Sequence, residues 1–423
     1  MLSIVWFTVI FASVAACYTG MVFDFWAAGF FLILVGSSYL AFAGYALASS
    51  RAVPVNTPCS TTARVNTVVG VVALLGIMAI FYDRTSIRGI DYIDMGIAAA
   101  RAELNRVGER GGAISIFGNL FSVAIYLPLI NLIFDWEKWG RERMLVLAIV
   151  IVGMAGLTYL TAGRTVILIA VAISAAAMLG RGALGMPRLP SFLTTGRLVA
   201  SIAGISVVFG MIFALRANAF GAASAGDYLS QLCIHLSQPA IEIMSQCSTT
   251  PVVSGSPSFD NFANYSTAVL LYAFHVAWVG DVIITDQNPG ITTTFSAIQD
   301  MFLSRFGGYQ ISATDYDGYF IPAAPGLVYD FGYLTMILSF ITLGMLFGVF
   351  QRNMQSGRLF LGRVAFCYIG TALMLAVLIS PANLPFYFLS IAAIGIIAIP
   401  TKMRMGVTPS YPNRIAKLPT TRA

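Results

Sequence analysis

The stretch from Met144 to Gly180 reads MLVLAIVIVGMAGLTYLTAGRTVILIAVAISAAAMLG and contains a single charged residue, Arg164. A helix that crosses a bilayer needs about 20 mostly apolar residues. Residues 144–162 and 165–180 each approach that length, and Gly163 and Arg164 between them leave room only for a tight turn. Glycine suits such a turn because it adopts backbone conformations that other residues resist. The stretch therefore predicts two consecutive membrane-spanning helices, joined by a turn that carries an arginine.

The same apolar pattern recurs along the chain. Apolar residues make up 58% of the sequence and charged residues only 10%, whereas a soluble domain usually carries about 25% charge. With the two runs above, the pattern predicts an all-α polytopic membrane protein of about ten spanning helices. The other runs cover residues 2–18, 25–47, 66–82, 113–134, 198–215, 333–350, 359–379 and 384–400. In the eighth of the ten, Gly344-x-x-x-Gly348 predicts close packing against a neighbouring helix.

The distribution of Lys and Arg predicts the orientation of these helices, because cytoplasmic loops carry an excess of both. With the N-terminus placed inside, the cytoplasmic segments hold 16 of the 24 Lys and Arg residues. These are Arg51, Arg64, Lys138, Arg141, Arg143, Arg181, Arg188, Arg197, Arg352, Arg358, Arg363, Lys402, Arg404, Arg414, Lys417 and Arg422. The prediction is an inner-membrane protein with both termini in the cytoplasm. The basic residues form no stripe, so nucleic acid is not an expected partner.

This orientation divides the chain into four regions. Residues 1–215 would hold the first seven helices, and residues 216–332 would form a large periplasmic region. Residues 333–400 would hold the C-terminal helices, and residues 401–423 a basic cytoplasmic tail.

The apolar run 266–285 inside the large outer region is long enough to span, but it contains His275 and Asp281. If it crossed the membrane, the stretch after it would be cytoplasmic and would hold one arginine, Arg305, against five aspartates. The Lys and Arg rule disfavours that arrangement. The run is therefore expected to be a re-entrant or interfacial element, which is tolerated where protein or a wet cavity covers it.

All eight basic residues that remain outside are arginines: Arg84, Arg88, Arg101, Arg106, Arg110, Arg164, Arg216 and Arg305. Arginine stays charged at any relevant pH and binds phosphate through a bidentate fork. Arg101, Arg106 and Arg110 lie in an amphipathic stretch and are expected to anchor it to lipid phosphates. Arg164 and Arg216 lie at helix ends near membrane depth, where an arginine is costly unless it is paired or functional. For these two, ligand binding and interfacial anchoring both remain open.

Other polar residues of the outer region could carry chemistry. His275 stands in an apolar setting, as either a structural hydrogen-bonding group or a general base. Asp330 either caps the helix expected from residue 333 or belongs to the site. Asp315 begins a sequence similar to a calcium loop, but the glutamate required at the twelfth position is replaced by Gly326. Neither a metal nor any other cofactor is expected.

The order of these motifs resembles that of the Wzy-type O-antigen polymerases and, more distantly, that of the O-antigen ligases. The resemblance rests on the turn Thr161–Thr165 and on Arg216 at the mouth of the large outer loop. It also rests on the aromatic-proline stretch Tyr319–Pro322 and on Asp330–Gly332, which precede a glycine-bearing helix. The resemblance implies a GT-C-like fold and an active site on the periplasmic side of the bacterial inner membrane.

The activity that the resemblance implies is glycosyl transfer from a growing glycan on undecaprenyl pyrophosphate to the next lipid-linked repeat unit. Its implied partners are both glycan lipids, the surrounding membrane lipid and a chain-length regulator protein. Breaking the sugar–phosphate bond builds negative charge on pyrophosphate, which preorganised arginines would stabilise. The catalytic candidates are Arg164, Arg216 and His275, and the substrate-binding candidates are Arg88, Arg305, Tyr319, Tyr329 and Asp330.

Two alternatives to a polymerase stay open on the sequence. A ligase would use the same donor but transfer the glycan to lipid A–core. A transporter or flippase for lipid-linked oligosaccharides would usually show internal repeats, and we find none in this sequence.

Overall fold

The computed structural model describes residues 1–18, 27–49, 61–92, 95, 99–100, 103, 113–161, 165–201, 203–204, 294–295, 321–356 and 360–402. All regular structure within these ranges is helical. Six helical segments are long and apolar enough to cross a membrane: Phe31–Ser49, Ala63–Ile87, Ala113–Asp135, Glu142–Thr161, Thr165–Ala183 and Ala323–Gln355. Leu2–Cys17, Leu361–Leu375 and Pro385–Ile397 are shorter apolar helices. The predicted class, an all-α polytopic membrane protein, is confirmed; ten spans stay a prediction.

Most of the predicted apolar runs coincide with a described helix. The helices are α1 (Leu2–Tyr18), α2 (Ala27–Ser49), α3 (Ala63–Tyr82), α5 (Ala113–Ser122), α6 (Tyr126–Asp135), α7 (Glu142–Thr161), α8 (Thr165–Ala183), α15 (Ala323–Gln355), α16 (Phe360–Leu375) and α17 (Pro385–Lys402). Three short elements of other helical types accompany them: η2 (Asp83–Ile87), η3 (Val123–Ile125) and η6 (Pro381–Asn383). The run 198–215 falls mostly outside the described residues, and 266–285 falls wholly outside them.

The single helix predicted over residues 113–134 is interrupted. α5 ends at Ser122, the 3₁₀ turn η3 follows, and α6 begins at Tyr126. Pro128 accounts for the interruption, because proline has no N–H to donate and its ring clashes with the carbonyl four residues earlier. A tight 3₁₀ turn is a common connector at such a place. The continuation, α6, is buried along most of its length, so the broken helix runs through the middle of the bundle.

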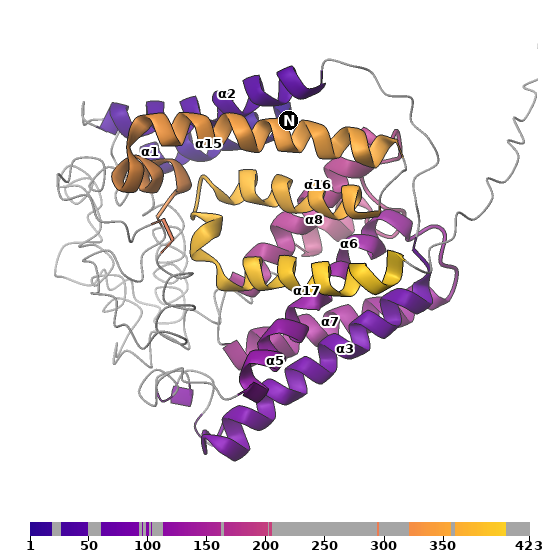
Figure 1. Ribbon diagram of the computed structural model, residues 1–423. Coiled ribbons are helices and arrows are strands. Elements are labelled where there is room, and N and C mark those ends of the chain that lie inside the picture. The colour runs from indigo at the N-terminus through magenta and orange to yellow at the C-terminus, as the bar shows by residue number, and fades with distance from the viewer. Residues whose placement is uncertain are drawn as a thin grey trace, which may run out of the picture.

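Helices α2 and α15 lie side by side (Figure 1) and approach each other closely. A Cβ atom added at Gly44 would collide with the backbone oxygen of Ile341, and one added at Gly344 would collide with that of Ala41. A Cβ at Gly348 would come within 2.9 Å of the Cβ of Ala48. Glycine is what lets the two backbones approach. The packing motif predicted at Gly344 and Gly348 is therefore confirmed.

Helix α15 extends from Ala323 to Gln355 and joins two helices across a kink at Gly332, so the helix predicted from residue 333 is its second part. Gly332 interrupts the helix with φ 79° and ψ 171°, a backbone conformation that favours glycine. Residues before this kink form a short buried helix, and residues after it form the long apolar segment. Figure 1 shows α15 packed between α2 and α16, with α8 beyond α16.

Hydrogen bonds between helices define one end of the bundle, which we call the Arg363 end. Arg363 Nη1 donates to Asp135 Oδ2 over 2.7 Å, and Arg181 Nη1 donates to the carbonyl of Ile133 over 2.7 Å. Gln355 Nε2 donates to the carbonyl of Ala183 over 3.0 Å. The last turns of α6, α8 and α15 therefore meet the first turn of α16.

The opposite end, which we call the Asp83 end, holds the end of α3 and the starts of α5, α8 and α15. Arg84 and Tyr92 both reach the carbonyl of Leu160 at the end of α7. The amide of Ala323, at the start of α15, donates to the carbonyl of Ala376 just after α16 over 2.8 Å. The residues that meet at the Asp83 end are those that the Lys and Arg rule predicts to be outside, so the Asp83 end is the predicted periplasmic end.

Candidate functional site

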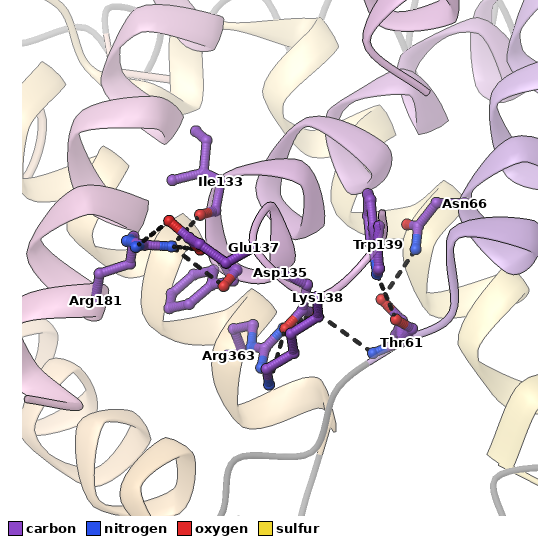
Figure 2. Close-up of polar contacts among 10 residues, drawn as sticks. Thr61, Asn66, Ile133, Asp135, Glu137, Lys138, Trp139, Arg181 and Arg363 are labelled. Atoms are coloured by element: carbon purple, nitrogen blue, oxygen red, sulfur yellow. Dashed lines mark hydrogen bonds and ion pairs between the residues drawn. The ribbon is translucent and has the colours of Figure 1, made fainter. Parts of the chain in front are cut away.

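Polar side chains gather at both ends of the bundle, and their pairing differs. At the Arg363 end, Asp135 has a side chain that is 0% exposed, and its partner Arg363 is 3% exposed. Lys138 Nζ lies 3.4 Å from Asp135 Oδ1, and the backbone amide of Thr61 donates to Oδ2 over 3.4 Å. Figure 2 shows the Asp135 carboxylate between these groups. A buried charge is tolerated only when paired and hydrogen-bonded, and Asp135 satisfies both conditions.

Arg181 forms the second ion pair of this end. Its Nη1 and Nη2 atoms donate to the two carboxylate oxygens of Glu137 over 3.0 and 2.9 Å (Figure 2). The same guanidinium donates to the carbonyls of Ile133 and Phe134, which lie in the last turn of α6, where carbonyls have no helical partner. Burial alone would raise the pKa of Glu137, but hydrogen bonds from Arg181 and from the amide of Ser191 outweigh it and lower that pKa. Arg181 is therefore a structural cap.

Both buried arginines of the Arg363 end are thus matched by carboxylates. A second network joins the same helices: Asn131 Nδ2 donates to Asn66 Oδ1, and Asn66 Nδ2 donates to the hydroxyl of Thr61. Trp139 Nε1 donates to the carbonyl of Thr61 over 2.8 Å. These contacts fasten the start of α3 to α6 and to the turn after α6. The arrangement stabilises the bundle and leaves neither buried arginine of this end without a carboxylate partner.

The Asp83 end begins where α3 continues into a π-helical turn, Asp83–Ile87. Its mark is the bond from the amide of Arg88 to the carbonyl of Asp83, five residues earlier and 3.0 Å away. π-Helical turns are rare and occur frequently at functional sites. Here the wider turn brings two arginines, Arg84 and Arg88, into the packed end of the bundle.

Arg88, a predicted substrate ligand, is engaged in an ion pair. Its Nε donates to Asp83 Oδ2 over 2.9 Å, and the two side chains are 9% and 1% exposed. Its Nη2 lies 3.5 Å from the hydroxyl of Ser115 at the start of α5. Asp83 balances the charge of Arg88, so the pair adds little net positive charge to the site.

Arg84 is in a different situation. The residue is 7% exposed, and Nη1 donates to the hydroxyl of Tyr92 over 2.9 Å and to the carbonyl of Leu160. Tyr92 in turn donates to the same carbonyl over 3.1 Å, and Tyr159 donates to the carbonyl of Tyr92 over 3.2 Å. All these acceptors are neutral. Within the described ranges no carboxylate lies within 4.0 Å of the Arg84 guanidinium, since Arg84 takes part in none of the ion pairs there.

The carbonyl of Leu160, which accepts from Arg84, lies next to the turn Thr161–Thr165. Leu160 immediately precedes Thr161, where α7 ends, and α8 begins at Thr165. The turn between them carries Arg164, which lies outside the described residues. The predicted site residues Arg216, His275, Arg305 and Tyr319 lie outside them too.

Tyr329 and Asp330 are described, and both are partly buried near the kink of α15. Asp330 Oδ2 accepts a hydrogen bond from the backbone amide of Thr294 over 2.6 Å. Two helices meet at Gly332 within α15, so the second begins where the sequence predicted a helix, and the alternative in which Asp330 caps it stays a prediction. The contacts of Asp330 and those of Arg88 lie at the same end of the bundle but in separate groups.

Sequence reasoning did not single out Arg84 among the outer arginines. The available signal was its spacing, since Arg84 and Arg88 are four residues apart and follow directly on an apolar helix. That spacing places two side chains on one face of a regular helix. The partner that distinguishes Arg84, the Leu160 carbonyl, lies 76 residues away along the chain and leaves no local pattern.

Comparisons with known proteins assign no family. No protein-family model matches the chain, and neither a curated protein nor a solved structure gives a significant match. In the parts of the chain that the structure describes, no three His, Cys, Asp or Glu side chains gather as a metal site would require.

Proposed function

We propose that this chain is a glycosyltransferase of the bacterial inner membrane, with its active site at the periplasmic face. It would polymerise oligosaccharide repeat units carried on undecaprenyl pyrophosphate into O-antigen or a related surface polysaccharide. The observation that supports this best is Arg84: a buried guanidinium at the predicted outer end, bonded only to neutral oxygens in the described residues and fixed beside the turn that carries Arg164.

The chemistry of the reaction explains why such an arginine matters. The leaving group is a lipid pyrophosphate, and its negative charge grows as the sugar–phosphate bond breaks. Preorganised donors in a dry site stabilise developing charge far more than water-exposed donors do. Arg84 is held in place by Tyr92 and Leu160, so its orientation would not have to be set during the reaction. The donor reaches this depth through the bilayer, which fits a protein whose polar residues lie at helix ends.

The closed Arg363 end favours an enzyme over a transporter. A transporter that exposes its substrate to both sides would have to separate α3, α6, α8 and α16 at that end in every cycle. The buried Asp135–Arg363 pair joins α6 to α16, and the Glu137–Arg181 pair, whose carboxylate is 42% exposed, joins the turn after α6 to α8. Such charge-assisted bonds are about twice as strong as neutral ones. A glycosyltransferase that works at the Asp83 end needs no such opening.

Substitution of Arg84 tests the proposal. In a strain that lacks the chromosomal copy, R84K should fold and reach the membrane but weaken the polysaccharide ladder by about 10- to 100-fold, because Lys keeps the charge and loses the bidentate fork. R84M should abolish the ladder. The matched control is Arg64, whose side chain is 88% exposed at the other end; R64K and R64M should leave the ladder intact.

The outcome for the polysaccharide also separates the alternatives. A strain without a polymerase attaches a single repeat unit to the core, whereas a strain without a ligase attaches none. An intact ladder in the deletion strain, or in well-expressed R84M protein, would contradict the proposal. We also expect R164A and R216A to abolish the ladder and R164K and R216K to leave a weak one, since both positions are proposed to bind pyrophosphate.

A further inference from the structure

The described turn Thr294–Phe295 is fastened to the bundle at the kink of α15. The amide of Thr294 donates to Asp330 Oδ2 over 2.6 Å, a short, charge-assisted bond. The ring of Phe295 meets that of Phe331 edge-on, with centroids 5.9 Å apart. Thr294 is 2% exposed, so its bond to Asp330 lies in the packed end of the bundle, whereas Phe331 is 41% exposed.

Ser380, in the turn between α16 and α17, also bonds to Thr294. Its hydroxyl donates to the carbonyl of Thr294 over 3.4 Å, and its amide donates to the carbonyl of Ile321 over 2.7 Å. One residue thus bonds to the chain on both sides of the stretch 296–320. Ala323 strengthens the second attachment, because its amide donates to the carbonyl of Ala376.

The kink at Gly332 explains why Asp330 is available for this bond. A continuous helix from Ala323 would keep one direction through residue 332. At Gly332, φ 79° instead changes the direction of the chain directly after Asp330 and Phe331. These two residues therefore stand at the end of a short helix, beside the turn they hold. The stretch whose two ends are attached here contains Arg305 and Tyr319, two of the predicted substrate ligands.

We propose that Asp330 and Ser380 form an anchor that joins the turn Thr294–Phe295 and the start of α15 to the Asp83 end of the bundle, with Asp330 as a positioning residue for substrate binding. The positioning role rests on the proposed function, whereas the anchor does not depend on it. The proposal assigns Asp330 a role as a hydrogen-bond acceptor from the backbone, in place of the direct substrate contact predicted from the sequence.

Two substitutions of Asp330 separate these roles. Asn keeps an oxygen that can accept from the Thr294 amide but cannot take a proton, so D330N should preserve the anchor and most of the ladder. D330A removes the acceptor, and a hydrogen bond to a charged group contributes about 1.5–3 kcal/mol. Hydrogen–deuterium exchange of the purified full-length protein, followed on the peptide that contains Thr294, should therefore speed up about 10- to 100-fold in D330A and by less than about threefold in D330N.

The control lies on the same helix. Thr335 donates from its hydroxyl to the carbonyl of Phe331 in an exposed bond, so T335A should change neither exchange nor ladder. Unchanged exchange at Thr294 in D330A would overturn the anchor. Faster exchange together with a full ladder would overturn the positioning role, and a ladder lost equally in D330N and D330A with normal exchange in D330N would assign Asp330 to proton transfer. If the chain proves not to make a polysaccharide at all, the exchange result still decides the anchor.

Discussion

The Asp135–Arg363 pair gives a quantitative test of how the Arg363 end is stabilised. Both side chains are almost completely buried, and Nη1 lies 2.7 Å from Oδ2. Removing one partner of a buried pair typically costs about 3–5 kcal/mol, because the other charge stays behind without compensation. R363M keeps most of the side-chain volume and removes the charge, so it isolates that cost.

The structure indicates the lower part of this range for R363M. Lys138 remains 3.4 Å from the other carboxylate oxygen, although it is 42% exposed and water screens it, and the amide of Thr61 still donates to Asp135. The variant also loses the stacking of Arg363 over the ring of Phe134, 4.6 Å to the centroid, so we expect a loss of about 3 kcal/mol. D135N should lose a similar amount, since it removes the carboxylate that pairs with the buried Arg363.

The double variant D135L/R363M provides the test that could refute this reasoning. Replacing a whole buried pair by apolar groups is often neutral or stabilising, so the double variant should lose less than about 1 kcal/mol. The assay is denaturant titration of the purified protein in mixed micelles, with R64M as the control for an exposed pair, Arg64–Glu142 at 3.8 Å, which should change stability by less than about 1 kcal/mol. Single variants that lose less than about 1 kcal/mol, or a double variant as unstable as the sum of both, would refute the reasoning.

Three further outcomes follow from the structure and the sequence. Because the folded pKa of Glu137 is lowered, its contribution to stability is present above the ordinary glutamate value of 4.5 and is lost as pH falls through the folded pKa; the stability difference between wild type and E137Q, read by thermal melting, should therefore shrink below that pH. G44A forces a methyl against the α15 backbone and should destabilise by about 1–3 kcal/mol, whereas G36A, which meets open space, should not; equal losses in both would rule out close α2–α15 packing. If His275 is a general base, H275Q and H275A should both lose about 100-fold or more of the polymerisation rate, whereas a structural histidine should tolerate Gln.

Hydropathy predicted the helices well because the membrane imposes one requirement on each of them. A spanning segment must satisfy every backbone group internally and present apolar side chains to lipid, and both properties are local. The start of α15 shows where this reasoning fails. Pro325, Asp330 and Gly332 make the sequence before residue 333 resemble a loop, and the helix forms there because it packs into the bundle and bonds to Ala376. That information lies about 50 residues away in the sequence.

From the sequence, only the type of chemistry at the candidate site could be predicted. The excess of arginine over lysine outside indicated phosphate-like chemistry, but it could not rank the arginines. Arg88 stands beside an aspartate that neutralises it, and Arg84 stands beside neutral carbonyl and hydroxyl groups. The two residues have the same local sequence environment, and only the fold distinguishes them, through the end of α7.

The contrast between the two ends of the bundle carries a consequence for where an anion can bind. At the Arg363 end, each buried arginine of the described residues has a carboxylate within 2.9 Å, so an incoming phosphate would have to displace an internal ligand. At the Asp83 end, Arg84 donates to a carbonyl and a phenol, and both bonds leave its charge uncompensated within the described residues. Because burying an uncompensated charge is costly, a pyrophosphate that reached Arg84 would form the ion pair that no described carboxylate forms with it. Arginine thus joins helices at one end, and we propose that it binds the anionic substrate at the other, according to the charge of its neighbours.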